Sequence, residues 1–206
     1  MRALVVCMLF AAPAWADSPR PAVAAATHAW QAADHEPDPV LARRLWHEAA
    51  IAWDRAVLPG DREDAYTALL AWKHARAPEL PKTADPEAQI PLDADDTGFL
   101  HALAVYLPVA PGDDATAVQF LRGDLYYRYR RYDDAERDFI AIVAQHPEHD
   151  AAEYSANLLL DSLNRQQRYG ELTTWVEKLR GNARLLAAHP DLRQTLQQLH
   201  DAQLRH

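Results

Sequence analysis

Helical spacing of the apolar residues runs almost unbroken through the second half of the chain, and this feature restricts the fold most strongly. After the turn at residues 111–113, apolar residues recur three and four positions apart, as on one face of a helix. Short connections around residues 130–132, 146–147, 167–168 and 181–182 separate the periodic segments. The spacing predicts helices over 114–129, 133–145, 150–166, 169–180 and 190–203.

The composition favours an all-α fold and excludes several other classes. The chain has 40 Ala and 26 Leu but only 4 Ile and 10 Val, and Ala and Leu are strong helix formers, whereas β-branched residues favour strands. Six Gly are few for a protein with many tight hairpins. A β-sandwich, a barrel and a Gly-rich nucleotide-binding fold are therefore not expected. The net charge of −9 makes nucleic acid a poor partner, because proteins that bind it normally carry a basic surplus.

The first sixteen residues have the pattern of a secretory signal peptide. Arg2 is followed by an apolar run over 3–14, and Ala14-Trp15-Ala16 fits the small-x-small cleavage rule. The run is shorter than the roughly 20 residues that cross a bilayer, so we expect cleavage after Ala16 and no membrane span in the mature protein. Cys7, the single cysteine, would be removed with the signal. The predicted location is a bacterial periplasm, or the medium if the protein is secreted.

Prolines and charge divide the rest of the chain. We expect a Pro/Ala-rich linker over 17–38 that holds a loose helix within 22–33, and then a helical hairpin over 39–78 in which Asp61 caps the second helix. Residues 79–112 are rich in proline and acid, and they predict a second linker with one short helix near 97–107. The run of helices described above then occupies 113–206.

Residues 116–149 fit a repeat template of about 34 residues. Two of its positions hold the small residues Gly123 and Ala135, and its aromatic and proline positions hold Tyr126, Tyr132, Phe139 and Pro147. This pattern resembles the tetratricopeptide repeat family. The resemblance implies a helical hairpin in which Gly123 touches Ala135 where the helices meet. Arg130 and Ile142 depart from the pattern, which usually has Gly and Ala at these positions.

A second unit resembles the same family over 153–179, after three extra residues, but bulkier residues such as Leu160 and Leu172 replace the small ones. The hairpin within 39–78 matches more weakly, with Gly60, Ala65 and Leu69 at template positions and Trp53 at a position that is usually small. Residues 183–206 would cap the array with a polar outer face. The resemblance thus implies an α-solenoid of helical hairpins, with an N-terminal hairpin of the same type and a C-terminal capping helix.

In that family, the first helix of each unit lines a concave groove that binds a partner. The resemblance places nine residues of this chain there: Phe120, Asp124, Tyr127, Arg128, Tyr154, Asn157, Asp161, Asn164 and Arg165. This mixture of aromatic, amide and charged side chains suits a bound peptide. Tyr126 would instead point into the interface between the helices.

Three patterns with possible metal chemistry are incomplete. His47-Glu48 begins like a zinc-protease helix, but Ile51 stands where the second histidine is needed. The acidic stretch from Asp93 resembles the start of a calcium loop, but Ala104 stands where a bidentate Glu is needed. His146, His149 and Asp150 could together hold zinc.

The sequence therefore predicts a scaffold or adaptor of the cell envelope that presents a groove to a protein or peptide partner, with no cofactor and no catalysis. Two alternatives stay open. The chain could be a small metal-dependent helical enzyme that uses the loop of His146 and His149. It could also be a fragment of a longer repeat array.

Overall fold

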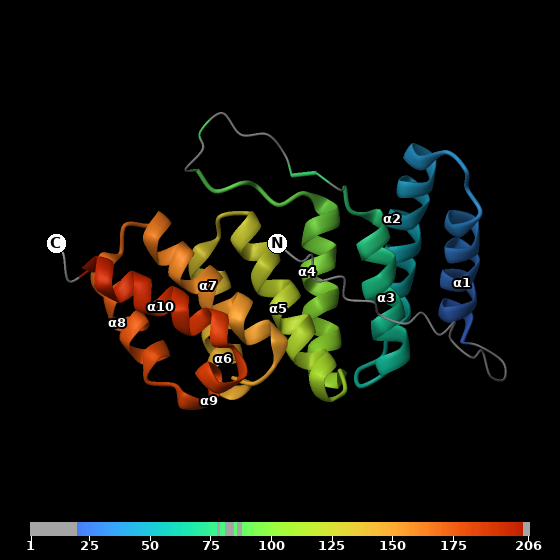
Figure 1. Ribbon diagram of the computed structural model, residues 1–206. Helices are drawn as coiled ribbons and strands as arrows, with labels where there is room; N and C mark the ends of the chain where they lie inside the picture. Colours follow the sequence, from blue (N-terminus) through green and yellow to red (C-terminus); the bar gives the residue numbers. More distant parts are fainter. Residues whose placement is uncertain (1–19, 78, 81–84, 86–87, 204–206) are drawn as a thin grey trace. The chain divides into compact units, whose positions relative to one another are not determined.

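The computed structural model describes residues 20–77, 79, 80, 85 and 88–203, and within these residues every regular element is helical (Figure 1). The expected all-α class is therefore confirmed. The signal-peptide prediction lies outside the described residues. The chain divides into two compact units, Met1–Ala75 and Arg76–His206, and each is considered by itself. None of the described helices is long and apolar enough to cross a membrane.

The first unit contains three helices: α1 (Pro21–Asp34), α2 (Pro39–Ala56) and α3 (Arg62–Ala75). The segment 17–38 was expected to be a linker with a loose helix within 22–33. The helix is present as α1, but it is a full helix that packs along α2 and not part of a linker. Pro21 and Pro39 begin their helices, where a missing N–H costs nothing. Asp38 caps α2 by accepting hydrogen bonds from the N–H groups of Val40 (2.9 Å) and Leu41 (2.8 Å).

The expected hairpin is formed by α2 and α3. Gly60 in the connection has φ +84°, a conformation that glycine adopts at little cost. Asp61 caps α3, because its carboxylate accepts the Asp64 N–H at 3.2 Å. Aromatic residues fill the interior of this unit. The ring centroid of Trp46 lies 4.7 Å from that of Trp30 and 4.5 Å from that of His74.

The second unit contains seven α-helices within the described residues. They are α4 (Ala94–Tyr106), α5 (Gly112–Arg128), α6 (Tyr132–Gln145), α7 (Asp150–Arg165), α8 (Tyr169–Arg180), α9 (Ala183–Ala188) and α10 (Pro190–Gln203), with a 3₁₀ turn η1 (Leu107–Val109) after α4. The helices predicted over 114–203 are all present, with ends that agree within two residues. The sequence pattern did not predict α9.

Helix α4 is a core element rather than a short helix in a linker. Phe99, Leu103 and Tyr106 on α4 are buried. Asp93 caps the helix by accepting the Asp96 N–H at 2.8 Å. Asp96 is itself buried, pairs with Arg76 and accepts the hydroxyl hydrogen of Tyr129. Burial raises the pKa of Asp96, and the hydrogen bond from Arg76 opposes this rise. Asp93 and Asp96 belong to the acidic stretch that resembles the start of a calcium loop. In the structure both carboxylates have partners within the protein.

Helices α5 and α6 pack closely where α5 carries a glycine. A Cβ on Gly123 would lie 2.8 Å from Cε1 of Phe139 and 3.1 Å from Cβ of Asp138. The close approach at Gly123 was expected, but its nearest neighbours are one turn further along α6 than Ala135. Arg122 reinforces the pair with a bidentate contact to buried Asp138, at 2.8 Å from Nε and 2.5 Å from Nη2.

The α5–α6 and α7–α8 turns share one backbone conformation, 37 positions apart. Arg130 and Gln167 both have φ +57°. In the first turn the Arg131 N–H bonds the Tyr126 carbonyl, and in the second the Arg168 N–H bonds the Leu163 carbonyl, both at 2.9 Å. The two turns are thus alike in φ and in this backbone hydrogen bond.

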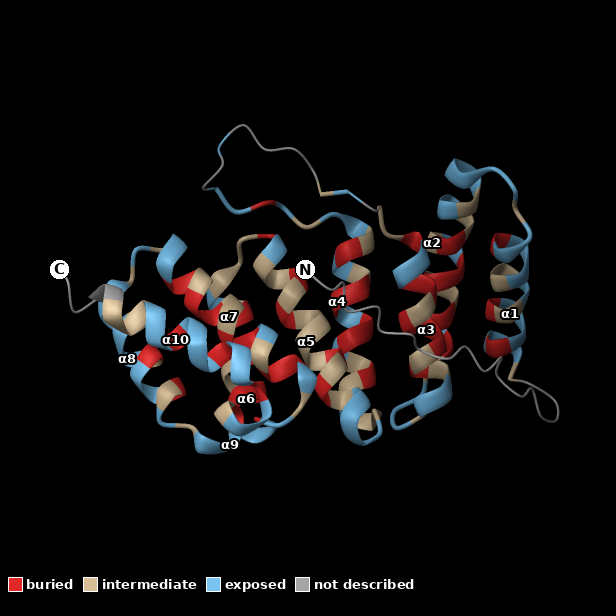
Figure 2. Ribbon diagram, viewed as in Figure 1, coloured by how far each residue is buried: buried red, intermediate tan, exposed pale blue. Residues whose placement is uncertain are grey.

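The C-terminal helices cover one end of this core. Leu192 and Leu196 of α10 are buried in a cluster with Val176 and Leu179 of α8 (Figure 2). The opposite side of α10 is polar and exposed, at Gln194, Gln197 and Gln198. Helix α10 is therefore apolar on the side that packs on the core and polar on the other side.

Candidate functional site

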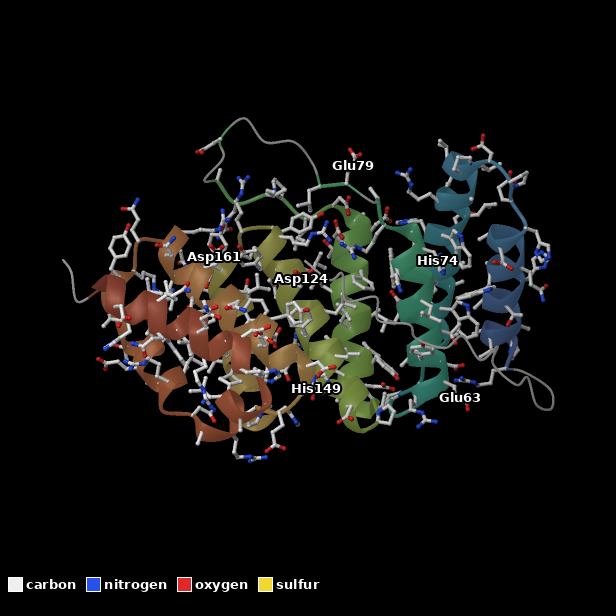
Figure 3. All side chains as sticks on the ribbon, in the orientation of Figure 1. Glu63, His74, Glu79, Asp124, His149 and Asp161 are labelled. Atoms are coloured by element: carbon white, nitrogen blue, oxygen red, sulfur yellow. The ribbon has the colours of Figure 1, made fainter. Side chains whose placement is uncertain are left out.

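The predicted site residues lie on α5 and α7, two helices that pack against each other. On each helix they recur three, four and seven positions apart and so share one face. We call this set the α5–α7 face; it comprises Phe120, Asp124, Tyr127 and Arg128 on α5, and Tyr154, Asn157, Asp161, Asn164 and Arg165 on α7. Asp124 and Asp161 are labelled in Figure 3.

Two contacts join the helices across this face. The ring centroids of Phe120 and Tyr154 lie 6.2 Å apart in a tilted arrangement. About two turns further along α5, Tyr127 donates its hydroxyl hydrogen to the carboxylate of Asp161. The structure therefore brings together residues from both helices that the sequence had assigned to one surface.

A charged group stands beside the second contact. The Arg165 guanidinium donates to the same Asp161 carboxylate and lies 6.0 Å from the ring centroid of Tyr127. Burial, followed by the hydrogen bond to Asp161, raises the pKa of Tyr127 to about 12. The hydrogen bond to Asp161 also raises the pKa of Arg165. At neutral pH the cluster thus consists of a neutral phenol, a carboxylate and a guanidinium.

The other polar residues of the face have no such contacts. The side chains of Asp124, Arg128, Asn157 and Asn164 make no hydrogen bond or ion pair with any other part of the chain that the structure describes. Asp124 is half-buried, and burial raises the pKa of its carboxyl, while Arg128 and Arg76 act in the opposite direction. Asn157 is also half-buried, whereas Arg128 and Asn164 are exposed. A half-buried polar group without a hydrogen-bond partner gains most from a hydrogen-bonding ligand.

The expected division between Tyr126 and Tyr127 is wrong. Both rings are half-buried, and both pack against the core cluster of Ala135, Phe139, Leu159 and Leu163. The reason is that Tyr127 is wide enough to reach its neighbours Tyr132 and Phe139, at 5.6 and 6.5 Å between centroids, while its hydroxyl extends to α7. Tyr127 therefore supports the face as well as forming part of it.

A buried carboxylate holds α7 and the start of α8 in place beneath the face. Glu136 of α6 accepts hydrogen bonds from Arg168 (2.9 Å to Oε2), Gln166 (2.7 Å) and Ser162 (3.0 Å). Each oxygen has a partner, so the cost of burying this charge is offset. The sequence pattern did not single out Glu136, because one acidic residue in an amphipathic helix looks like a surface residue.

The structure gives one of the three proposed zinc ligands another contact. His149 (Figure 3) caps α7, because its Nδ1 accepts the Ala151 N–H at 3.0 Å. No group of three or more His, Cys, Asp or Glu side chains suited to a metal occurs in the described ranges.

A pocket of about 380 Å³ adjoins the α5–α7 face, and sequence analysis did not predict it. It lies at the two turns of like conformation, and it is lined by Gln89, Arg130, Tyr132, Asp133, Arg165, Gln166 and Gln167. A signal was present in the sequence: Arg130 stands where the repeat pattern usually has glycine.

No protein-family model, no curated protein and no solved structure matches this chain. The site is therefore interpreted from its own residues.

Proposed function

We propose that this chain is a non-enzymatic binding module, a scaffold or adaptor of the bacterial cell envelope that holds a peptide or helix of a protein partner on its α5–α7 face. The observation that carries the proposal is the composition of this one face. It combines the aromatic pair of Phe120 and Tyr154 with the Tyr127–Asp161–Arg165 cluster and with four polar side chains that have no hydrogen-bond partner among the described residues.

The chemistry of these groups suits a peptide ligand. Tyr154 is 38% exposed and offers a ring on which an apolar side chain can rest. Asn157 and Asn164 can each donate to a carbonyl and accept from an N–H, which are the groups of a peptide main chain. The rigid helices hold these groups in place before the partner arrives, which reduces the entropy lost on binding. The hairpin packing of α5–α8 and the resemblance to tetratricopeptide repeats also support the proposal.

Site-specific photo-crosslinking in envelope extract tests this function. A photo-crosslinking residue placed at Asn157, which is half-buried and unpaired among the described residues, should capture the partner. The same residue at Glu177, which is exposed on α8, is the matched control. The proposal predicts a protein adduct at 157 that is absent at 177. Equal capture at both positions, or capture at 177 alone, would contradict it.

The proposed location depends on residues 1–16 of the sequence. If these residues are a signal peptide, the exported protein begins at Asp17. Sequencing the N-terminus of the protein recovered from a periplasmic fraction tests this directly. Full-length protein that stays in the cytoplasm would contradict the location.

A further inference from the structure

The α5–α6 turn already binds main-chain groups of a loop, and this loop belongs to the chain itself. The Ile90 N–H donates to the Tyr129 carbonyl at 3.1 Å. Nη1 of Arg130 donates to the carbonyls of Asp85 (3.0 Å) and Ala88 (2.7 Å). The side chain of Ile90 is buried. In Figure 1 the loop before α4 passes over the end of α5, where these contacts form.

The α7–α8 turn repeats the backbone of this turn and has an amide side chain where the first turn has the guanidinium of Arg130. Gln166 and Gln167 take the positions of Tyr129 and Arg130, with the same φ of +57° at Gln167. Within the described residues, neither the Gln166 carbonyl nor the Gln167 side chain has a hydrogen-bond partner. The second turn thus has a free acceptor and a free amide where the first has an occupied carbonyl and a clamping guanidinium.

The backbone at both positions favours glycine over other residues. A non-glycine residue with positive φ costs of the order of 1 kcal/mol. At Arg130 the side chain offsets this cost, because its guanidinium donates hydrogen bonds to the carbonyls of Asp85 and Ala88. At Gln167 the same strain is present, but the exposed side chain has no contact of this kind.

The pocket of about 380 Å³ opens between the two turns, and three glutamines, Gln89, Gln166 and Gln167, stand in its wall. Of its charged lining residues, Arg165 is paired with Asp161, and the Arg130 guanidinium donates to main-chain carbonyls. Glutamine amides can both donate and accept hydrogen bonds, so the wall suits a hydrogen-bonding ligand. A peptide main chain has this character, and it is what occupies the neighbouring turn.

We infer that the α7–α8 turn is a second binding site, which takes a peptide segment of a partner by main-chain hydrogen bonds. The peptide donates one N–H to the Gln166 carbonyl and accepts one hydrogen bond from Nε2 of Gln167, with its side chains in the pocket beside Gln89. This site is distinct from the α5–α7 face and does not depend on the function proposed for that face.

A synthetic peptide that copies residues 85–92 of this chain, blocked at both ends, is the probe. It is titrated into the ¹⁵N-labelled chain, residues 17–206, and backbone and side-chain amide shifts are followed by NMR. The inference predicts saturable shift changes at Gln166 and Gln167. In Gln167→Gly the affinity should fall about fivefold, as the loss of one hydrogen bond predicts. This variant should stay folded, because glycine suits the positive φ.

A second probe removes the other hydrogen bond. In it proline replaces the isoleucine that corresponds to Ile90, so the donor to the Gln166 carbonyl is missing, and we expect it to cause no shift changes at the turn. Equal affinity of wild type and Gln167→Gly, equal binding of both probes, or shifts confined to Tyr129 and Arg130 would overturn the inference. Shifts confined to the α5–α7 face would also overturn it, while leaving the proposed function intact.

Discussion

The hydroxyl of Tyr127 on α5 donates to the carboxylate of Asp161 on α7, and Arg165 donates to the same oxygen of that carboxylate. One carboxylate thus connects the first helices of two successive hairpins. The bond fixes these helices relative to each other and so fixes the arrangement of the α5–α7 face.

Removing the Tyr127 hydroxyl should cost a modest amount of stability. Tyr127→Phe keeps the ring contacts with Tyr132 and Phe139 but loses the hydrogen bond to Asp161. We expect the free energy of unfolding to fall by about 1 kcal/mol. Hydrogen bonds to charged groups contribute more to stability than hydrogen bonds between neutral groups, but solvent around the half-buried pair weakens this hydrogen bond. Denaturant unfolding measures the change. Tyr154→Phe is the control, because the Tyr154 hydroxyl has no partner in the described part of the chain, and it should leave stability unchanged. Similar losses in both variants would mean that the bond is not formed.

The raised pKa of Tyr127 makes the fold sensitive to alkali. An unfolded tyrosine titrates near pH 10, whereas in the folded protein the pKa of Tyr127 is about 12. The unfolded state therefore loses this proton first, and the stability that the protonated phenol provides, complete below pH 10, is lost as the pH rises toward 12. Ultraviolet titration of tyrosinate should show one late-titrating group fewer in Tyr127→Phe than in the wild type. If the late group persists in the variant, the assignment is wrong.

His74 should make the first unit sensitive to acid. Burial lowers the pKa of His74, Lys73 adds to this effect and Asp34 opposes it. The folded pKa lies below the unfolded value, so stability is complete above about pH 6.5 and falls as the pH drops from there toward the folded pKa. His74→Phe keeps a ring against Trp46 and removes the titration, so acid unfolding should shift to lower pH. Tryptophan fluorescence reports this, because Trp30, Trp46, Trp53 and Trp72 all lie in this unit. His28→Phe, at an exposed site, should leave the transition where it is in the wild type.

The approach of α5 to α6 predicts opposite results at two glycines. A methyl group at Gly123 would meet the fully buried ring of Phe139, and the overpacking cost of about 1–3 kcal/mol exceeds or offsets the gain in helix propensity of about 1 kcal/mol. Gly170→Ala meets nothing within 4 Å and should be neutral or stabilising by up to about 1 kcal/mol. Thermal melting of the two variants compares them. A Gly123→Ala protein more stable than Gly170→Ala would show that the helices are further apart than described.

The sequence predicted the helices well because their signal is local. The apolar spacing and the short connections over 114–203 determine where helices begin and end, and the described helices agree. The α1 segment was misjudged, because four prolines near its ends suggested a linker, although two of them simply begin helices.

The site was predicted only in part. The repeat pattern placed Phe120, Tyr127, Tyr154, Asp161 and Arg165 on one face, and the structure joins them by direct contacts. The pattern could not show that Tyr127 also packs in the core, since that depends on the distance between α5 and α7. The pocket was missed for a similar reason, because two turns 37 positions apart and the loop before α4 meet only in three dimensions.

The affinity of the captured partner for two tyrosine variants tests the binding face most directly. Tyr154, on the face, and Tyr169, at the start of α8, are both exposed, at 38% and 58%, so alanine at either position should change stability by no more than about 1 kcal/mol. We predict that Tyr154→Ala weakens partner binding by about tenfold or more, as aromatic anchors do, and that Tyr169→Ala binds like the wild type. Unchanged binding in Tyr154→Ala, or an equal loss in both variants, would contradict the proposal that the partner binds the α5–α7 face.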